Sequence, residues 1–362
     1  MRVLLTGSAV PPPPDGAWPG RDVVPTAAGP SLADVASWWS AHGAVDTVPL
    51  AASGPALLDA LAPVAPEVLA GVVPGPGGAE VPVAVRRRAS SSREGAQART
   101  VVVDVSQVPA TGEAVVVDAD GTPTTVPARS STAVGHLLAL AVDAARAGTD
   151  PGRVVLATGG STSHDGGLGA LLALAGEPPA SGGAPDVTPA GLVDVVRAAR
   201  AALGGSHLVA AVASDVPLLG LHGASATLDA RGVDPLVAQH LERALGAVAH
   251  DVAAAAARAA AAGPGAHGIV GRELLAGATA GRRLAGLPGA GSGGGLGFAV
   301  AALGGRLVPA LRVVADDVGL DARLAAADVV VVLADGGGGA AGGGGAVRAG
   351  GGRAARRGGR GW

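Results

Sequence analysis

Short runs of Val, Leu and Ala alternate with longer helical patterns over most of this chain, and this alternation restricts the possible folds more than any other feature. Residues 153–157, 208–213 and 328–333 have the length and the nearly continuous apolar composition of strands buried on both faces. Helical patterns at 131–147 and 188–203 precede the first two of these runs. Because parallel strands need a long crossover, usually a helix, this order predicts an α/β fold with a mostly parallel sheet flanked by helices.

The first sixty residues predict further elements of the same kind. Arg2–Thr6 predicts a short strand, Ser31 is a candidate N-cap for a helix that runs to about His42, and Asp46–Leu50 predicts the next strand. The remaining predictions here are a helix at 53–61 and Pro- and Gly-rich loops at 11–30 and 63–78.

The middle of the chain has a different character. Val81–Val85, Thr100–Val105 and Ala114–Val117 are rich in β-branched residues, which predicts strands, and the polar segment Arg86–Arg99 between them predicts an exposed insertion. A chain of 362 residues, of which 48% are apolar, is long enough for two domains. We therefore expect the middle segment to belong to a second domain.

The composition excludes several kinds of chemistry. Cysteine is absent, which rules out disulfides, thiolate nucleophiles and Cys-ligated metals. A formal net charge of −3 does not provide the basic surface that a nucleic-acid partner requires. The apolar stretches are too short or too interrupted for a membrane span, and the N-terminal apolar run is too short for a signal peptide. We expect a cytoplasmic protein without a membrane or nucleic-acid partner, and its oligomeric state stays open.

Residues 336–362 consist almost only of Gly, Ala and Arg. Such a segment buries too little apolar area to offset its conformational entropy, so we predict that it is disordered. Tails rich in Arg and Gly can bind RNA. The competing and favoured interpretation is a frameshifted or degenerate terminus of a GC-rich gene.

The segment ATGGSTSHDGGLGALLALAG at 157–176 follows a predicted strand and enters a helix. Glycines at this position let the backbone pass close to an anion, and Ser161 and Asp165 add a hydroxyl and a carboxylate. The segment therefore predicts a phosphate or carboxylate cradle, with a tight strand-to-helix turn as the alternative. A Walker A loop is excluded because the sequence has no Lys. The glycines that let the backbone approach an anion here include Gly159, Gly160 and Gly166.

Two further glycine-containing segments follow. The segment VASDVPLLGLHGASATLDARG at 212–232 places Asp215 just after a predicted strand, where ligands of α/β sheets bind. Asp215 is a candidate base or magnesium ligand, and an N-cap or turn residue is the alternative. The segment LPGAGSGGGLGF at 287–298 is a glycine-rich turn before a helix, whose amides suit a nucleotide phosphate.

Together these segments resemble the bacterial glycerate kinase family. That family has a GGSxTNDGG-like loop, an SDVxNPLxGxxGA segment, a GAGAAGGxGF turn and a VGLDxxLxxADLV strand entry. The matching positions are 159–167, 214–224, 289–298 and 318–330, and the helix that begins RSSTAVGHLL at Arg129 is also similar. The resemblance covers about residues 129–332.

The resemblance implies transfer of the γ-phosphoryl group of ATP to D-glycerate with Mg²⁺, by a two-domain α/β protein with its active site in the interdomain cleft. It implies a discontinuous domain of residues 1–65 and 285–335 and an inserted domain of 66–284. The implied catalytic residues are Ser161, Asp165 and Asp215, with Asp215 at the metal. The implied substrate-binding residues are Gly159, Gly160, His164 and Gly166, and the implied nucleotide-binding residues are Gly291, Gly293 and Gly294.

The sequence departs from the family at several motifs. The PDSFKGS-like loop after the first strand reads TGSAVPPPP, without the carboxylate and the Lys, and the acidic DGGEGT segment reads ASGPA at 52–56. His164 stands at a family Asn, either as a base or phosphate ligand or as a tolerated replacement. A triad of Ser161, His164 and Asp165 is excluded because triad partners come from separate segments.

These departures leave three hypotheses open. The leading one is a glycerate kinase or a close relative that phosphorylates a small hydroxy acid. The second is a catalytically impaired paralogue that keeps the fold and binds a small anion or nucleotide. The third is a degraded product that does not fold stably, which a cooperative thermal transition would exclude.

Overall fold

A computed structural model describes most of the chain, in two compact units. One unit consists of residues 1–51 and 311–362, and the other of residues 52–310. The described residues are 1–7, 31–75, 78–89, 99–110, 114–117, 123–126, 130–146, 151–177, 188–231, 233–261, 281–333 and 348–351.

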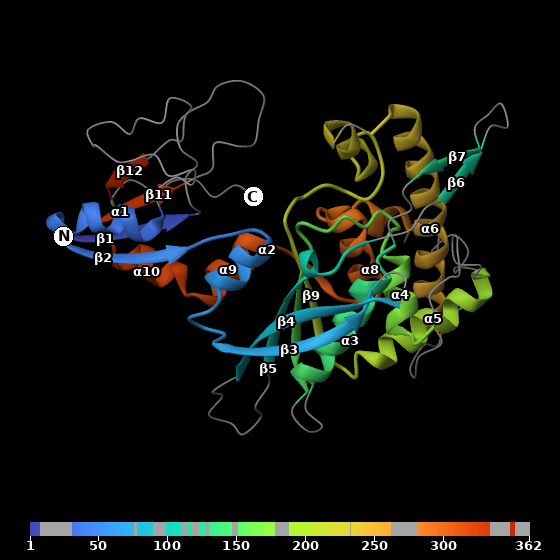
Figure 1. The fold of residues 1–362 in the computed structure, drawn as a ribbon, viewed down its shortest axis with the longest axis horizontal. Helices are drawn as coiled ribbons and strands as arrows, with labels where there is room; N and C mark the ends of the chain where they lie inside the picture. Colours follow the sequence, from blue (N-terminus) through green and yellow to red (C-terminus); the bar gives the residue numbers. More distant parts are fainter. Residues whose placement is uncertain are drawn as a thin grey trace. The chain divides into compact units, whose positions relative to one another are not determined.

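The smaller unit is built on three parallel strands, with β1 (Arg2–Gly7) between β2 (Ala44–Pro49) and β11 (Val329–Leu333) (Figure 1). Its helices are α1 (Leu32–Trp39), η1 (Ser40–His42), α9 (Ala310–Asp317), which begins at the unit boundary, and α10 (Leu320–Ala326). Ser31 caps α1 as predicted, because its hydroxyl accepts from the Asp34 N–H while the Asp34 carboxylate accepts from the Ser31 N–H. Buried Val and Leu side chains from β1, α1 and β11 form the core of this unit.

The glycine- and arginine-rich C-terminal segment contains one described element. Strand β12 (Arg348–Gly351) pairs antiparallel with β11 at the edge of the small sheet. The prediction of disorder across 336–362 is therefore wrong for these four residues, since backbone pairing needs no apolar side chains. The rest of that prediction lies outside the described residues.

The larger unit contains a mixed sheet in the strand order β10-β9-β8-β5-β4-β3 (Figure 1). The four strands from β10 to β5 are parallel, as predicted, whereas β4 and β3 continue the sheet as an antiparallel pair. A separate hairpin is formed by β6 (Ala114–Val117) and β7 (Pro123–Val126). The strands of the sheet are β3 (Glu67–Pro74), β4 (Glu80–Ala89), β5 (Arg99–Asp104), β8 (Arg153–Ala157), β9 (His207–Val212) and β10 (Arg306–Pro309).

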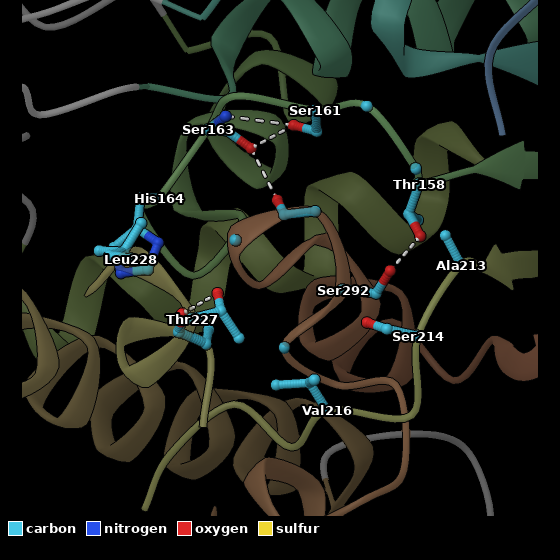
Figure 2. Close-up of a pocket in the computed structure, with 16 residues that line it drawn as sticks. Thr158, Ser161, Ser163, His164, Ala213, Ser214, Val216, Thr227, Leu228 and Ser292 are labelled. Atoms are coloured by element: carbon cyan, nitrogen blue, oxygen red, sulfur yellow. Dashed lines mark hydrogen bonds between the residues drawn. The ribbon is translucent and has the colours of Figure 1, made fainter. Parts of the chain in front are cut away.

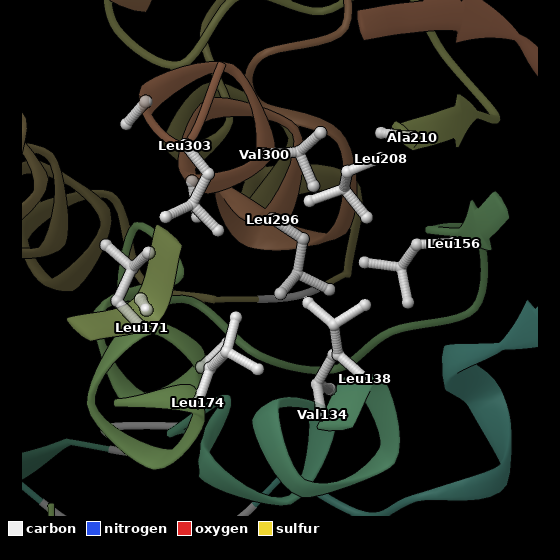
Figure 3. Close-up of a cluster of buried hydrophobic side chains, with 14 of the residues drawn as sticks. Val134, Leu138, Leu156, Leu171, Leu174, Leu208, Ala210, Leu296, Val300 and Leu303 are labelled. Atoms are coloured by element: carbon white, nitrogen blue, oxygen red, sulfur yellow. The ribbon is translucent and has the colours of Figure 1, made fainter. Parts of the chain in front are cut away.

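The helices of the larger unit bury apolar faces of Val, Leu and Ala, as expected for a chain with so few aromatic residues. Figure 3 shows Leu296 and Val300 of α8, and Leu303 just after it, packed against leucines of α3, α4 and β8. Phe298, the only Phe, is fully buried in the same core. The helices are α2 (Gly54–Ala60), η3 (Val105–Gln107), α3 (Thr132–Ala145), α4 (Leu168–Leu174), α5 (Pro189–Ala202), η4 (Ser225–Arg231), α6 (Pro235–Ala261), η6 (Ser292–Gly294) and α8 (Leu296–Ala302).

Two sequence predictions near β3 and β4 are wrong. The predicted loop at 63–78 contains β3, an edge strand, where a Gly in the strand and a terminal Pro are tolerated. The predicted exposed insertion at Arg86–Arg99 begins with the last residues of β4, while residues 90–98 lie outside the described part. The arginines fit a strand because Arg87 pairs with Glu67 directly opposite on β3.

The units differ in extent from the two predicted domains. Residues 285–310, assigned by sequence to the discontinuous domain, belong to the larger unit, because β10 pairs with β9 and α8 packs on β9. Residues 52–65 likewise join the larger unit, where α2 packs on β5. Among the described residues, no helix has both the length and the apolar character needed to cross a membrane.

Candidate functional site

The larger unit has a polar pocket at the carboxyl ends of β8 and β9. Because both strands are parallel neighbours, the segments that follow them leave the sheet at the same edge. The glycine-rich turn before α8 completes the pocket, which has a volume of about 220 Å³ (Figure 2). Its lining residues are Thr158, Gly159, Gly160, Ser161, Ser163, His164, Ala213, Ser214, Val216, Ala224, Thr227, Leu228, Gly291, Ser292, Gly293 and Gly294.

The segment after β8 contributes two linked serine hydroxyls. Ser161 Oγ lies 2.8 Å from Ser163 Oγ and accepts a hydrogen bond from the Ser163 N–H at 3.2 Å. Ser163 is buried, and its hydroxyl donates to the Gly293 carbonyl oxygen at 2.8 Å. The predicted substrate loop is therefore joined directly to the predicted nucleotide loop.

A second hydroxyl pair joins the same two segments. Thr158 Oγ1, fully buried at the end of β8, lies 2.7 Å from Ser292 Oγ in the turn before α8 (Figure 2). Thr158 also donates from its hydroxyl to the Ala211 carbonyl oxygen of β9 at 3.3 Å. The two pairs fix the position of the glycine-rich turn relative to the sheet.

Gly294 shows why glycine is required where these segments cross. Its backbone has a φ of +65°, and a Cβ at this position would lie 1.8 Å from the Ser163 carbonyl oxygen. The Gly294 carbonyl oxygen in turn accepts from the Gly166 N–H at 3.1 Å. The close approach of two backbones therefore explains Gly294 without a ligand, although the residue also lines the pocket.

The N–H groups of Gly160 and Ser161 are the best candidates for an anion contact. Gly160 has a φ of +75° and is exposed at the pocket. Within the described residues neither N–H has a protein acceptor. Successive backbone N–H groups in such a turn can bind an anion, which keeps the predicted cradle as a hypothesis for this segment.

Of the pocket-lining residues that the structure describes, only His164 is titratable. It is half-buried, and its Nε2 lies 3.0 Å from the hydroxyl of Ser225 at the start of η4. Depending on the tautomer, this nitrogen donates or accepts. His164 therefore touches both the pocket and the segment that follows β9.

Asp165 is not among the pocket-lining residues, and its carboxylate has a complete set of partners. It accepts from the N–H groups of Ser131, Gly167 and Gly169 and from the Ser131 hydroxyl, at 2.8 to 3.0 Å. Burial raises the pKa of Asp165, and these hydrogen bonds oppose the rise. The geometry makes Asp165 a bridge between the start of α3 and the start of α4.

Asp215 has the opposite surroundings. It is exposed just after β9, between the pocket-lining residues Ser214 and Val216. No group of three His, Asp or Glu side chains that could hold a metal occurs in the described stretches. Mg²⁺ commonly binds through one or two carboxylates plus substrate phosphates, so a single exposed carboxylate fits an ion that a nucleotide supplies.

The comparisons with known proteins agree with the sequence motifs. The model of the glycerate kinase family matches residues 31–340. This chain belongs to the glycerate kinase family. Its structure is also similar to a solved one described as "putative glycerate kinase 2 from Salmonella typhimurium LT2", with a TM-score of 0.57 and 21% identity, over 92% of this chain and 78% of that chain. Among curated proteins, none matches.

The family match extends beyond the resemblance seen in the sequence, which covered residues 129–332. It begins at residue 31, after the altered loop TGSAVPPPP. Most of that loop lies outside the described residues. That departure therefore falls where the glycerate kinase family model makes no match, whereas the altered ASGPA segment at 52–56 lies inside the match.

Sequence reasoning missed several residues beside the glycerate kinase motifs. Thr158 and Ser292 line the pocket, yet no local pattern marks hydroxyls that meet across 134 residues. Asp104 ends β5 and is fully buried, and burial raises its pKa while hydrogen bonds from Ser106 and Gly54 oppose this. Asp104 lies at the carboxyl end of a parallel strand, and Asp215 lies just beyond one. This position is the sequence signal that could have marked Asp104 as a candidate.

Proposed function

We propose that this protein transfers the γ-phosphoryl group of ATP to glycerate or a similar small hydroxy acid. The observation that supports it is the convergence of three of the family motifs on one polar pocket of about 220 Å³. The N–H groups of Gly160 and Ser161, which have no protein acceptor among the described residues, suit a carboxylate, and serine hydroxyls suit a substrate hydroxyl. A pocket of this size and polarity favours a small acceptor.

The proposed roles follow the geometry. Gly159, Gly160 and Ser161 would bind the hydroxy acid, and His164 would contact its charged or hydroxyl groups. Asp215 would hold Mg²⁺ together with phosphate oxygens, or accept the proton of the attacking hydroxyl. When bound, the ion neutralises charge on the transferred phosphoryl group. The remaining glycines of the proposal are Gly166, Gly291, Gly293 and Gly294, the last three toward the nucleotide.

Asp165 has a different proposed role from Asp215. Its oxygens already accept four hydrogen bonds from Ser131, Gly167 and Gly169. We assign it to positioning the segment that carries Ser161, without contact to the reacting atoms. The cytoplasmic location stays a prediction from the sequence.

The test is a coupled ADP-release assay on the full chain with D-glycerate, ATP and Mg²⁺. We expect turnover that falls about 100-fold in Asp215→Asn, the size of effect that loss of a general base produces. Asp194→Asn is a matched control, since Asp194 is exposed on α5 and pairs with Arg197 at 2.5 Å. Equal turnover in Asp215→Asn would remove Asp215 from the mechanism.

A second candidate function is binding without phosphoryl transfer. It is favoured by the pocket lining, where the described residues include no Asp, Glu or Arg. A well-folded sample that binds D-glycerate or ATP in calorimetry, yet releases no ADP, would support this paralogue.

A further inference from the structure

A buried aspartate lies at the sheet edge where the pocket forms. Asp104 ends β5, the parallel neighbour of β8, and its side chain is fully buried. Its register partner on β8 is Ala157, two residues before the turn formed by Gly159 and Gly160. The carboxylate is therefore close in the fold to the backbone that carries the candidate anion contact.

Three hydrogen-bond donors from two segments bind this carboxylate. Ser106 of η3 donates both its N–H, at 3.1 Å, and its hydroxyl. The third donor is the N–H of Gly54, the first residue of α2. Asp104 therefore joins the start of α2 to η3, although the two segments are far apart in the sequence.

Each of the two joined segments also contacts one glycine of the turn. A Cβ added to Gly159 would lie 2.2 Å from the Cβ of Ser53, the residue before Gly54. A Cβ added to Gly160 would lie 3.0 Å from the Cβ of Ser106. Both serine side chains therefore pack directly against the backbone of the turn.

A second contact fixes η3 to the sheet. The side-chain amide of Gln107 accepts from the Ala84 N–H of β4 at 2.7 Å and donates to the Ala84 carbonyl oxygen at 2.9 Å. Ser106 is thus held between the bonds of Asp104 and those of Gln107. A turn that packs against a fixed side chain keeps its own N–H groups in a fixed direction.

We propose that Asp104 is a positioning residue, which holds the N–H groups of Gly160 and Ser161 in the direction that a substrate carboxylate requires. This inference rests on the proposed function, which assigns these N–H groups to the hydroxy acid. Donors that are already oriented bind an anion without the cost of ordering the backbone. Asp104 acts through the two segments that it joins, because it is fully buried and does not line the pocket.

The alternative is a purely structural role for Asp104. Burial raises the pKa of this carboxyl group even though hydrogen bonds from Ser106 and Gly54 oppose the rise. The ionised carboxylate is therefore less favourable in the folded protein than in water, so its charge does not stabilise the fold. This observation favours a role in positioning over one in stability.

The test measures the affinities for D-glycerate and ATP separately by calorimetry, together with steady-state kinetics of the full chain. Asn has the shape of Asp but only one accepting oxygen. We expect Asp104→Asn to raise the Kd and the KM for D-glycerate about tenfold, the size of one net hydrogen bond, and to leave ATP binding unchanged. A purely structural role would lower the fraction of folded protein and the apparent kcat, without changing either affinity.

Ser106→Ala repeats the test at an exposed position. It removes one of the three donors and should weaken D-glycerate binding about threefold. In the double variant with Asp104→Asn the two effects should not multiply, because both changes break the same contact. The control is Asp59→Asn, since Asp59 is exposed on α2, pairs with Arg86 and does not line the pocket.

The outcomes separate this inference from the proposed function. Weaker D-glycerate binding in Asp104→Asn, with no ADP release by wild type, would overturn the kinase proposal and support the positioning role. ADP release with wild-type affinity for D-glycerate in both Asp104→Asn and Ser106→Ala would overturn the positioning role alone. Equal weakening of D-glycerate and ATP binding would also overturn it, as would the absence of D-glycerate binding to folded wild-type protein.

Discussion

The segments that follow β8 and β9 both have an aspartate soon after a parallel strand, yet the two aspartates have opposite surroundings. Asp165, after β8, accepts four hydrogen bonds from two helix starts. Asp215, after β9, is exposed, and in the described part of the chain its side chain has no hydrogen-bond partner. Position after a strand therefore does not decide the role of an acid. The hydrogen-bond donors around the carboxylate distinguish the two residues. All four donors to Asp165 are protein groups, which indicates that its carboxylate stabilises the fold.

If the β8 segment is a fixed part of the fold, the largest loss of stability should come from separating it from the turn before α8. Gly294→Ala would place a Cβ 1.8 Å from the Ser163 carbonyl oxygen at a φ of +65°. We expect a loss of about 3 kcal/mol in the free energy of unfolding, measured by urea denaturation.

Gly176→Ala is the matched control for this prediction. Gly176 has a φ of +82°, but a Cβ there would meet nothing within 4 Å. Its substitution should cost only about 1 kcal/mol, from the backbone conformation. Equal losses in the two variants would show that the segments do not need their close approach.

The second effect concerns the aspartate of the β8 segment. Asp165→Ala leaves the Ser131 and Gly169 N–H groups without their acceptor. We expect a loss of about 2 to 3 kcal/mol in unfolding free energy. Asp194→Ala, at an exposed position of α5, should change stability by less than about 0.5 kcal/mol. A stable Asp165→Ala protein that has lost only turnover would return Asp165 to the catalytic residues.

The third effect is the pH dependence of stability, and it concerns Asp104, the buried aspartate at the end of β5. Burial raises the pKa of Asp104 above its ordinary value of 3.8 in the folded state. The folded protein therefore holds the Asp104 proton to higher pH than the unfolded chain, and wild type loses stability as pH rises through that window. Relative to wild type, Asp104→Asn should therefore become more stable as the pH rises above about 4. Urea unfolding at each pH measures this, and a pH-independent difference contradicts it.

The smallest effect on stability should come from the aspartate of the β9 segment. Asp215→Asn removes a charge from an exposed side chain, so the unfolding free energy should change by less than about 0.5 kcal/mol. The melting curve and the ADP-release rate are measured on the same sample. A large loss of stability would mean that Asp215 has structural partners in the folded protein and would remove the contrast with Asp165.

The sequence predicts the strand and helix pattern well where apolar runs are long. β8, β9 and α5 lie within one or two residues of their predicted positions, because buried strands and N-caps leave clear local signals. β3 was missed because its Pro and Gly content is typical of loops, while an edge strand tolerates both. Short β10 was missed because only its pairing with β9 defines it.

The candidate site was predictable in part for the same reason. The glycine-rich segments, Ser161 and His164 are local patterns, and all of them reach the pocket. Asp165 is equally prominent in the sequence, yet only the structure shows that its oxygens are occupied by Ser131 and nearby glycines. The pairing of Thr158 with Ser292 depends on how two distant loops pack, and no property of either residue alone encodes it.

The smaller unit begins with the first strand of the chain and ends with one of the last. The N–H of Arg2 bonds to Asp328, 326 residues later, and Val3 to Gly7 of β1 pair with β11. During synthesis, the residues of the larger unit are made after β1 and before β11. At ordinary translation rates, β11 therefore follows β1 by on the order of tens of seconds. During that interval, β1 can pair with β2 but not with β11. A stop codon before residue 329 would leave that strand permanently unpaired on one side, even though every residue of the pocket would already be present.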